Sequence, residues 1–283
     1  MSDGVTLAQA QRRGVELLAA TPADADIDVD WLLTAATGLS AAQRRAHPED
    51  PITETAWRRF QALLQRRYRG EPVAYLLGRR GFLDFELVVT SAVLIPRPET
   101  EHLVEAALET PAARVLELGT GSGCIAIALA RAWPAATVDA TDCSAEALTV
   151  ATQNAAILGA DGIRFRLGDW YEPVSGSRYN LIVANPPYIG EQAPEPDQGD
   201  ARFEPRLALR AEESGLAALR TIIVGAPRHL EPAGRIWLEH GYDQGPAVRE
   251  CLAAHGFQAI ETRRDLAGHE RVSGGRLGDT PHE

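Results

Sequence analysis

The sequence predicts an α/β fold in which a mostly parallel sheet carries helices on both faces and follows a small N-terminal helical bundle. Three observations predict it. Beyond residue 95, short apolar runs alternate with longer amphipathic segments, the order that gives a parallel sheet. Before residue 81, apolar residues recur only at helical spacing. Two β-like runs between these regions predict a β-hairpin, so we expect a bundle over 1–80, a hairpin linker over 81–95 and the sheet domain over 96–283.

Three helices are predicted in the N-terminal bundle. They cover Leu7–Ala20, Asp28–Thr37 with Gly38 as its end, and Thr53–Arg69 with Gly70 as its end. Such a bundle can serve as a folding cap, or it can grip the body of a large substrate protein. The apolar positions at helical spacing include Trp31, Leu32, Trp57, Phe60, Leu63 and Leu64.

The predicted hairpin pairs Phe82–Val88 with Ala92–Ile95 through the turn Val89-Thr90-Ser91. Pro96-Arg97-Pro98 then stiffens the entry to a helix that begins near Glu99. Arg97 can line a cleft or simply pair with a nearby acid, and we do not place it in the site.

A strand, a glycine turn and a helix follow one another in the next segment. The strand is Arg114–Leu118, which contains Glu117, and the helix is Cys124–Arg131. The turn Gly119-Thr120-Gly121-Ser122-Gly123 lets the backbone approach a ligand closely at a helix N-terminus. Its spacing is G-x-G-x-G, which differs from the G-x-G-x-x-G of a nicotinamide fingerprint.

Polar residues follow the next two predicted strands. Asp142 directly follows the predicted strand Thr137–Thr141 and lies about 20 residues beyond the glycine turn. At this position a carboxylate can accept hydrogen bonds from a ribose diol. Asp142 can alternatively cap the predicted helix Ser144–Leu158, although Ser144 can cap it equally well, and we favour ribose binding. The strand Ile163–Leu167 precedes Gly168-Asp169-Trp170, which is either a clasp for an adenine ring or a polar loop anchored by one tryptophan.

The tetrapeptide Asn185-Pro186-Pro187-Tyr188 ends the apolar run Leu181–Ala184 and describes a site for a planar NH2 group. A conjugated NH2 group is a poor nucleophile until acceptors hold both of its N–H bonds. The Asn185 side-chain oxygen and a backbone carbonyl can do this, because the two prolines restrict the backbone and aim both oxygens. Tyr188 adds an aromatic face for stacking. The alternative interpretation is a stiff strand-to-loop turn.

The remaining pattern completes the alternation of strands and helices. The connection Ile189–Glu213 is long for a compact domain, as lids and binding loops often are. Right-handed crossovers would bring Gly119, Asp142, Asp169 and Asn185 to one edge of the sheet, where such sheets bind ligands. The predicted elements are helices Ser214–Leu230 and Gly245–His255 and strands Gly234–Glu239, Phe257–Glu261 and Glu270–Ser273, and Leu277–Glu283 is predicted to be a loose tail.

Together these motifs resemble the Rossmann-like class I S-adenosylmethionine methyltransferases, and within them the HemK/PrmC family of protein-glutamine N5-methyltransferases. The resemblance runs from about Glu71 to Arg276. It rests on Glu117-Leu-Gly-Thr-Gly-Ser-Gly123, Asp142, Gly168-Asp-Trp170, Asn185-Pro-Pro-Tyr188, Leu94-Ile-Pro-Arg-Pro-Glu-Thr-Glu101, Gln198-Gly-Asp-Ala-Arg-Phe-Glu-Pro205, Leu238-Glu-His-Gly241 and Glu270-Arg-Val272.

The resemblance implies a substrate, a cofactor and roles for residues. The substrate would be the glutamine of the Gly-Gly-Gln motif in peptide chain release factors, and the cofactor S-adenosylmethionine. The turn Gly119–Gly123 would hold the cofactor's amino acid end, Asp142 its ribose and Trp170 its adenine region. Asn185 and the Pro186 carbonyl would hold the glutamine amide near Tyr188. The expected site also includes Glu117, Thr120, Gly121, Ser122, Asp169 and Pro187.

Composition predicts a cytoplasmic enzyme without a metal. No stretch approaches the roughly 20 apolar residues that span a bilayer, and the N-terminus lacks the pattern of a signal peptide. Cys124, Cys143 and Cys251 lie far apart without a C-x-x-C pair, and the histidines show no H-x-x-x-H grouping. We expect a monomer.

Charge favours a protein substrate over a nucleic acid. Lys plus Arg number 28 against 39 Asp plus Glu, a net charge of −11, whereas phosphate binding needs an electropositive face. The acidic segment Glu191–Glu204 would suit a basic protein loop. The arginines cluster at Arg58-Arg59, Arg66-Arg67, Arg69 and Arg79-Arg80, which we interpret as a solvated helix face that can also touch RNA.

The predicted chemistry is direct in-line displacement at the methyl group, without a covalent enzyme intermediate or a dedicated base. Four other functions stay open. An adenine-N6 methyltransferase that acts on nucleic acid would hold the exocyclic NH2 group of the base with the same kind of Asn-Pro-Pro-Tyr turn. A glutamine methyltransferase of a ribosomal protein fits the same residues. A nicotinamide oxidoreductase disagrees with the glycine spacing. A binding module without activity disagrees with the presence of both Asn185 and Tyr188.

Overall fold

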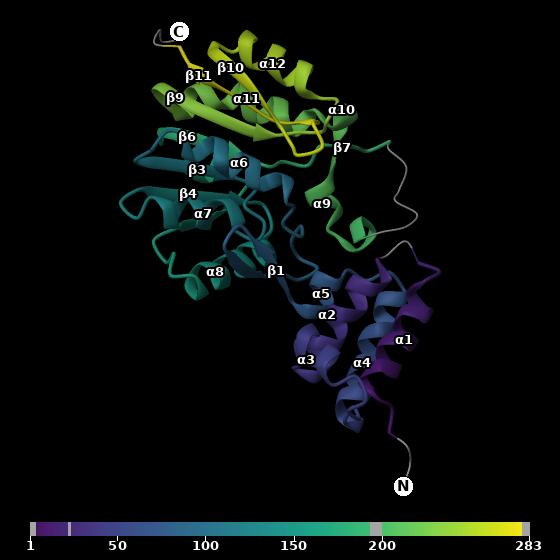
Figure 1. The fold of residues 1–283 in the computed structure, drawn as a ribbon. Coiled ribbons are helices and arrows are strands. Elements are labelled where there is room, and N and C mark those ends of the chain that lie inside the picture. The colour runs from purple at the N-terminus through teal and green to yellow at the C-terminus, as the bar shows by residue number, and fades with distance from the viewer. Residues whose placement is uncertain (1–3, 22–23, 193–199, 279–283) are drawn as a thin grey trace. The chain divides into compact units, whose positions relative to one another are not determined.

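The computed structural model describes residues 4–21, 24–192 and 200–278. These residues form two compact units, one of residues 4–79 with 200–203 and the other of 80–192 with 204–278 (Figure 1). Of the predicted C-terminal tail, 279–283 lie outside the described residues. Its first residue, Leu277, is instead the buried last residue of a strand.

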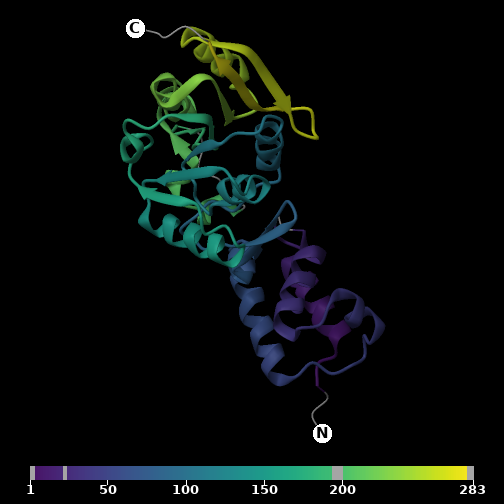
Figure 2. The same ribbon diagram turned by 90° about the vertical axis from the view of Figure 1, so that its left-hand side faces the viewer.

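The first unit is a helical bundle of five helices within its described residues (Figure 2). Phe60 and several leucines form its core, as the helical spacing predicts. Trp31, expected among the packing residues, is instead 51% exposed. The three long helices were predicted and the two shorter ones were not. They are α1 Leu7–Leu18, α2 Ala25–Thr37, α3 Ala41–Ala46, α4 Glu54–Tyr68 and α5 Val73–Leu77.

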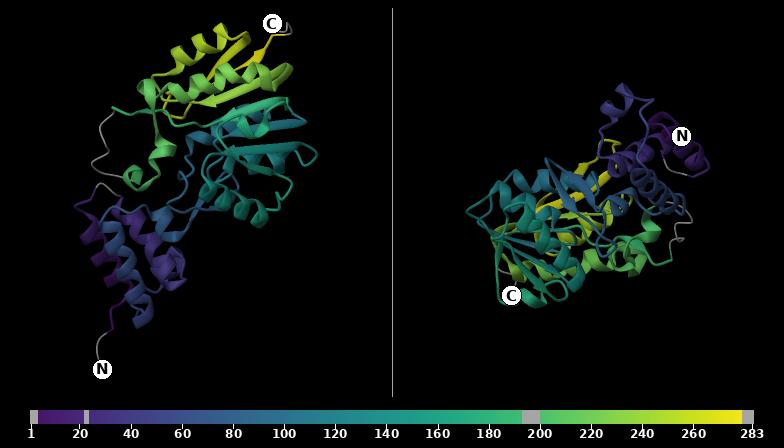
Figure 3. Two further views of the ribbon diagram at one scale, coloured as in Figure 1. Left: turned by 180° about the vertical axis from the view of Figure 1, so that it is seen from behind. Right: turned by 90° about the horizontal axis from the view of Figure 1, so that it is seen from below.

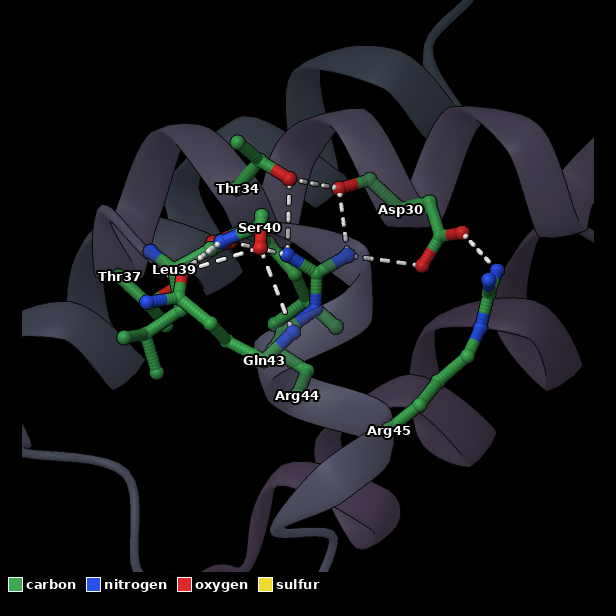
Figure 4. A network of polar contacts seen from close by, with 9 residues as sticks. Asp30, Thr34, Thr37, Leu39, Ser40, Gln43, Arg44 and Arg45 are labelled. Atoms are coloured by element: carbon green, nitrogen blue, oxygen red, sulfur yellow. Dashed lines mark hydrogen bonds and ion pairs between the residues drawn. The ribbon is translucent and has the colours of Figure 1, made fainter.

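Helix α3 is held against α2 by a buried arginine (Figure 4). The Arg44 guanidinium donates to the Thr34 hydroxyl at 2.8 Å and to the Leu39 carbonyl at 2.6 Å. It also donates to the Asp30 carboxylate at 2.8 Å, which Arg45 contacts from the exposed side at 2.9 Å. Because a buried charge is costly unless it is paired, these partners explain why a six-residue helix is fixed in place.

The hairpin exists, but its strands are not the predicted ones. Strand β1 Arg79–Phe82 pairs with β2 Phe85–Val88, and the chain reverses at Leu83-Asp84, where Leu83 has φ of 50°. The run Ala92–Ile95, predicted as the second strand, is irregular. Its apolar character reflects burial of Val93 and Ile95 in the domain and not pairing with Phe82–Val88.

The second unit is built on a seven-stranded sheet, which confirms the predicted α/β class. Strands β3, β4, β5, β6 and β9 run parallel, whereas β11 lies antiparallel between β9 and β10. A short loop joins β10 to β11, so these two strands can pair only as an antiparallel hairpin. The order is β10-β11-β9-β6-β3-β4-β5, with bounds β3 Arg114–Leu118, β4 Thr137–Asp142, β5 Arg164–Leu167, β6 Tyr179–Ala184, β9 Leu230–Glu239, β10 Phe257–Arg264 and β11 Glu270–Leu277.

Helices cover both faces of this sheet. Helices α6 Glu99–Leu108, α7 Cys124–Ala132 and α8 Ala145–Ile157 lie on the face toward the viewer in Figure 1. Helices α11 Ala217–His229 and α12 Gly245–Ala254 cover the other face, seen from behind in Figure 3. Along β3, Val115 packs into the hydrophobic core on one face of the sheet and Leu116 into the core on the other face. This alternation is expected of a strand that is buried on both sides.

The predicted long connection after residue 188 contains short ordered pieces. Strand β7 Ile189–Gly190 pairs with β8 Arg210–Ala211, and residues 193–199 lie outside the described residues. Glu213 and Ser214 have positive φ values of 51° and 58°, so the following long helix begins at Ala217 and not at the predicted Ser214. The other short elements are the 3-10 turns Glu172–Val174 and Asp200–Phe203 and the helices α9 Arg206–Leu209 and α10 Glu212–Gly215.

Candidate active site

The register of the sheet brings the predicted site residues to one edge. Leu118 of β3 pairs with Thr141 of β4 and with Ala184 of β6. Gly119, Asp142 and Asn185 therefore leave the sheet side by side, at the carboxyl end of the parallel strands. They line a cavity of about 580 Å³, a size that holds a small-molecule ligand.

The glycine turn forms one side of this cavity. Gly119, Gly121 and Gly123 have φ values of 72°, 55° and 83°, a region that residues with a Cβ enter at a cost. The Gly119 and Thr120 amides both donate to the Thr141 carbonyl, at 2.9 and 3.0 Å. The turn leads directly into α7, so its backbone is fixed where a ligand can approach closely.

Glu117 places a buried acid beneath the turn. Its Oε2 accepts hydrogen bonds from the Thr120 hydroxyl at 2.6 Å and from the Ala126 amide at 2.9 Å. Its Oε1 has no partner among the described residues. Burial raises the pKa of this carboxyl to about 8, with the nearby Asp142 charge acting in the same direction. Because Glu117 lines the cavity, its unpaired oxygen suits a cationic group on a ligand.

Asp142 does not cap the helix that follows it. The Ser144 hydroxyl caps α8 by accepting from the Ala147 amide at 3.1 Å. The Asp142 carboxylate accepts from the Ser144 amide and the Gly121 amide, both at 2.9 Å, and it lines the cavity. A carboxylate has about four lone-pair positions, so two acceptor positions are left for ligand hydroxyl groups.

Asp169 and Trp170 also line the cavity. Trp170 has φ of 40°, and its carbonyl accepts from the Thr141 hydroxyl at 3.0 Å. The indole packs near the glycine turn, because a Cβ added to Gly119 would lie 3.6 Å from Trp170 Cζ3. The acid and the indole are therefore close to the loop that was predicted to act with them.

The Asn-Pro-Pro-Tyr turn contributes Asn185 and Pro187 to the cavity lining, whereas Pro186 and Tyr188 are not among the lining residues. The Asn185 Nδ2 donates to the Thr100 hydroxyl at 3.1 Å. In the part of the chain that the structure describes, no group donates to its Oδ1. The Tyr188 hydroxyl instead lies 3.4 Å from Glu239 Oε1, and burial strongly raises the pKa of this phenol.

Sequence reasoning missed other residues at this cavity. Thr100, which was not considered, and Arg97, which was left out of the expected site, both line it. Arg97 also forms an ion pair with Glu204, so it both lines the cavity and pairs with an acid. The buried Glu204 also accepts from the Ile95 amide at 3.0 Å. It is therefore an internal partner of Arg97. The expectation that the acidic segment Glu191–Glu204 meets a basic protein loop stays a prediction, because 193–199 lie outside the described residues. The pairing of Arg97 with an acid more than 100 positions away has no signal in the sequence.

Other predictions concern features outside the cavity. In the arginine cluster, Arg58 pairs with Glu54 at 2.7 Å and Arg67 with Asp28 at 2.6 Å. None of the helices in the described residues is long and apolar enough to cross a membrane. Within the same residues, no three His, Cys, Asp or Glu side chains gather in a way that could hold a metal ion, and all three cysteines are free thiols.

Comparison with known proteins yields two family domains and close relatives. Residues 9–78 match the PrmC N-terminal domain, and residues 98–201 match the methyltransferase small domain. The release factor glutamine methyltransferase of Xylella fastidiosa is 48% identical over 92% of this chain and 96% of that protein. The protein of the same description from Bordetella pertussis is 50% identical over 92% of this chain and 98% of its own length.

Among solved structures, a methyltransferase from Pyrococcus furiosus superimposes with a TM-score of 0.54 at 16% identity, covering 77% of this chain and 98% of that one. At that identity the likeness shows the fold alone.

Proposed function

We propose that this chain, which belongs to the release factor glutamine methyltransferase family, transfers a methyl group from S-adenosylmethionine to the N5 amide nitrogen of the glutamine in the Gly-Gly-Gln motif of peptide chain release factors. One observation carries the proposal. The glycine turn, which suits a nucleoside cofactor, and Asn185, which suits a carboxamide, line the same cavity. Donor and acceptor sites therefore adjoin.

The residues on the cofactor side fit S-adenosylmethionine. The unpaired Oε1 of buried Glu117 suits an ammonium group, Asp142 suits the ribose hydroxyls, and Trp170 offers an apolar face for the adenine. When bound, S-adenosylmethionine supplies an electrophilic methyl group on a sulfonium that is already a good leaving group. The chain's own task is to align the incoming nitrogen and to exclude water.

Asn185 and the Pro186 carbonyl are the proposed acceptors for the two N–H bonds of the substrate amide. The amide nitrogen becomes more acidic as it forms its new bond to carbon, so these hydrogen bonds strengthen in the transition state and lower the barrier. The departing proton goes to water in this proposal. Holding the nitrogen within about 3 to 3.5 Å of the methyl carbon, in line with the leaving group, supplies several kcal/mol of the rate enhancement.

The test is incubation with isotopically labelled S-adenosylmethionine and a purified release factor, followed by mass spectrometry of the Gly-Gly-Gln peptide. We expect a gain of one CH2 unit on the glutamine. A release factor whose motif glutamine is replaced by glutamate should acquire no label. Transfer only to a ribosomal protein or to adenine in nucleic acid would reject the proposal in favour of one of these alternatives.

We further propose that residues 1–80 recognise the body of the release factor, that 81–95 join this region to the rest, and that 96–283 carry the transfer reaction. The match of residues 9–78 to a domain of this family supports the division. Because release factors act at cytoplasmic ribosomes, we propose that the chain works in the cytoplasm, as a monomer. Exchanging exposed side chains of α1 or α4 should then raise KM for the release factor and leave kcat unchanged.

A further inference from the structure

Helix α9 forms part of the cavity wall but has no part in the proposed chemistry. Its Leu207 and Ala208 line the cavity, and Pro205 does so just before the helix. None of the four residues of α9, all of which the structure describes, is buried. Leu207 is 65% exposed, so it lies at the mouth of the cavity and not on its floor. A four-residue helix has no stability of its own in water, so other contacts must hold α9 in place.

Glu204, two residues before α9, fastens the first end of this wall. Its side chain has no exposed surface, and its two carboxylate oxygens have different partners. Oε1 accepts from the Ile95 amide at 3.0 Å, and Oε2 forms the ion pair with Arg97. Prolines on both sides of Arg97 and directly after Glu204 restrict the backbone of the two segments. A charge-assisted pair between two stiff segments therefore sets where the wall begins.

The second end of α9 is fastened beside the Asn-Pro-Pro-Tyr turn. Strand β8 directly follows α9 and pairs with β7, which directly follows Tyr188. The Arg210 guanidinium also donates to the Gly190 carbonyl at 2.9 Å and to the Glu191 carbonyl at 3.1 Å. The helix is thus held at both ends, and its second end adjoins the proposed acceptor site.

We infer that Leu207 is a specificity-determining residue that contacts the substrate backbone at the mouth of the cavity, and that Glu204 positions it there. This inference rests on the proposed transfer to the glutamine of a Gly-Gly-Gln motif. The glutamine side chain is short, so the substrate backbone must come close to the mouth before the amide can reach Asn185. A backbone passes a bulky side chain most closely where it lacks a Cβ, which is at glycine. Leu207 therefore selects for glycine directly before the glutamine.

The same contact contributes affinity. A substrate that covers the exposed Leu207 side chain removes apolar surface from water, which favours binding. A Cβ on the residue before the glutamine would instead push the substrate backbone away from the mouth and the amide away from Asn185. One methyl group that a site cannot accommodate changes kcat/KM by about 10 to 100-fold.

The first experiment measures kcat/KM for two release factors, one with the Gly-Gly-Gln motif and one with Gly-Ala-Gln. We expect the wild type to prefer the first by about 10 to 100-fold and Leu207→Ala to prefer it by about threefold or less. The control is Leu266→Ala, which should keep the wild-type preference because Leu266 is 98% exposed and outside the cavity lining. An unchanged preference in Leu207→Ala, or no preference in the wild type, would overturn the inference.

The second experiment tests Glu204 as the positioning residue. Glu204→Gln keeps the shape but loses the charge, and we expect KM for the release factor to rise by about 10-fold with an unchanged Kd for S-adenosylmethionine. The preference for Gly-Gly-Gln should also fall, because Leu207 is no longer held at the mouth. Arg97→Lys keeps the ion pair and should retain most of the preference, whereas Arg97→Met should lose it. A lower melting temperature of Glu204→Gln with the wild-type preference would mean a purely structural role and would overturn the role of Glu204.

A third readout involves no transfer and separates this inference from the proposed function. In protein with ¹³C-labelled leucine methyl groups, the Leu207 resonances can be assigned by their loss in Leu207→Ala. With S-adenosylhomocysteine bound, we expect these resonances to shift when the release factor is added. Methyl transfer to the glutamine in an assay, together with Leu207 resonances that do not shift, would overturn this inference and leave the proposed function standing. A shift of these resonances without any transfer in the assay would overturn the proposed function and leave Leu207 as a contact of the release factor.

Discussion

The glycine turn Gly119–Gly123 and the Asn185–Tyr188 turn line one cavity, but different forces hold them. Backbone conformation shapes the glycine turn, whose three glycines have positive φ values and whose Gly119 and Thr120 amides donate to the Thr141 carbonyl of the adjacent strand. Side chains from distant segments hold the other turn, because Asn185 depends on Thr100, 85 positions earlier, and Tyr188 on Glu239, 51 positions later.

The difference shows how the two halves of the site should respond to change. Substitutions in the glycine turn should act through local strain and so weaken cofactor binding. Substitutions around Asn185 should leave the cofactor bound and reduce the rate, because they alter an orientation that matters only when the acceptor is present.

The largest expected effect is that of Asn185→Ala. The variant loses one of two acceptors for the substrate N–H bonds, and we expect kcat to fall by about 10² to 10³-fold, as on removal of an oxyanion-hole donor. Titration calorimetry should give an unchanged Kd for S-adenosylmethionine. Asn180→Ala is the control, since Asn180 lies near the other end of the same strand, where its side-chain oxygen accepts from the Arg114 amide at 3.0 Å. Near-normal kcat in Asn185→Ala would remove the contrast between the two turns.

A smaller effect separates Asp142 from its neighbour Ser144. Asp142→Ala should weaken S-adenosylmethionine binding by about 10 to 100-fold, because a charged acceptor for ribose hydroxyls is lost. Ser144→Ala should leave the Kd nearly unchanged and cost about 1 kcal/mol of folding stability through loss of the α8 cap. Calorimetry and thermal unfolding of both variants make the comparison. An unaltered Kd in Asp142→Ala would assign that carboxylate to the structure of the loop alone.

Gly121→Ala should have a smaller effect still. Gly121 has φ of 55° and no atom near the position of an added Cβ, so the substitution introduces backbone strain without a clash. We expect about 1 kcal/mol of strain and a Kd for S-adenosylmethionine raised by about fivefold. Gly159→Ala, at φ of 69° and equally open, should lose similar stability and keep its cofactor affinity. Equal affinities in the two variants would show that the turn does not contact the cofactor.

The smallest expected effect is a change in how thermal stability depends on pH. The folded-state pKa of Glu117 is raised to about 8 from an ordinary value of 4.5. Its contribution to stability is therefore fully present below pH 4.5 and is lost as the pH rises through about 8. Relative to Glu117→Gln, the cofactor-free wild type should lose a few degrees of Tm between about pH 5 and pH 9. Parallel Tm curves would show that Glu117 ionises normally.

Much of the glycine-turn half of the site was predictable because its signals are local. Strand, turn and helix follow one another within Arg114–Ala132, and the position of Asp142 follows from the length of one βα unit. The Asn185 half was predictable only in part. The tetrapeptide indicated the acceptor, but nothing near it in the sequence pointed to Thr100 or Glu239. The stacking role predicted for Tyr188 stays a prediction, since the ring is not part of the cavity lining.

Two other predictions failed for a related reason. The hairpin was placed at Phe82–Val88 and Ala92–Ile95 because both runs are apolar, yet burial and strand pairing give the same pattern of apolar residues. Glu204 was included in the acidic segment expected to meet a basic protein loop, although it is buried and paired with Arg97. Local composition does not reveal which residues a distant segment will cover.

By itself the sequence determined the class of sheet, the order of its strands along the chain and the residues that end them, because periodicity and glycine and proline chemistry act over a few positions. Only the tertiary structure decided which strand ends lie side by side at one edge of the sheet and which buried groups lie behind them. Strand register and the partner of a buried carboxylate depend on packing between segments far apart in the chain, and that packing sets the orientation of Asn185.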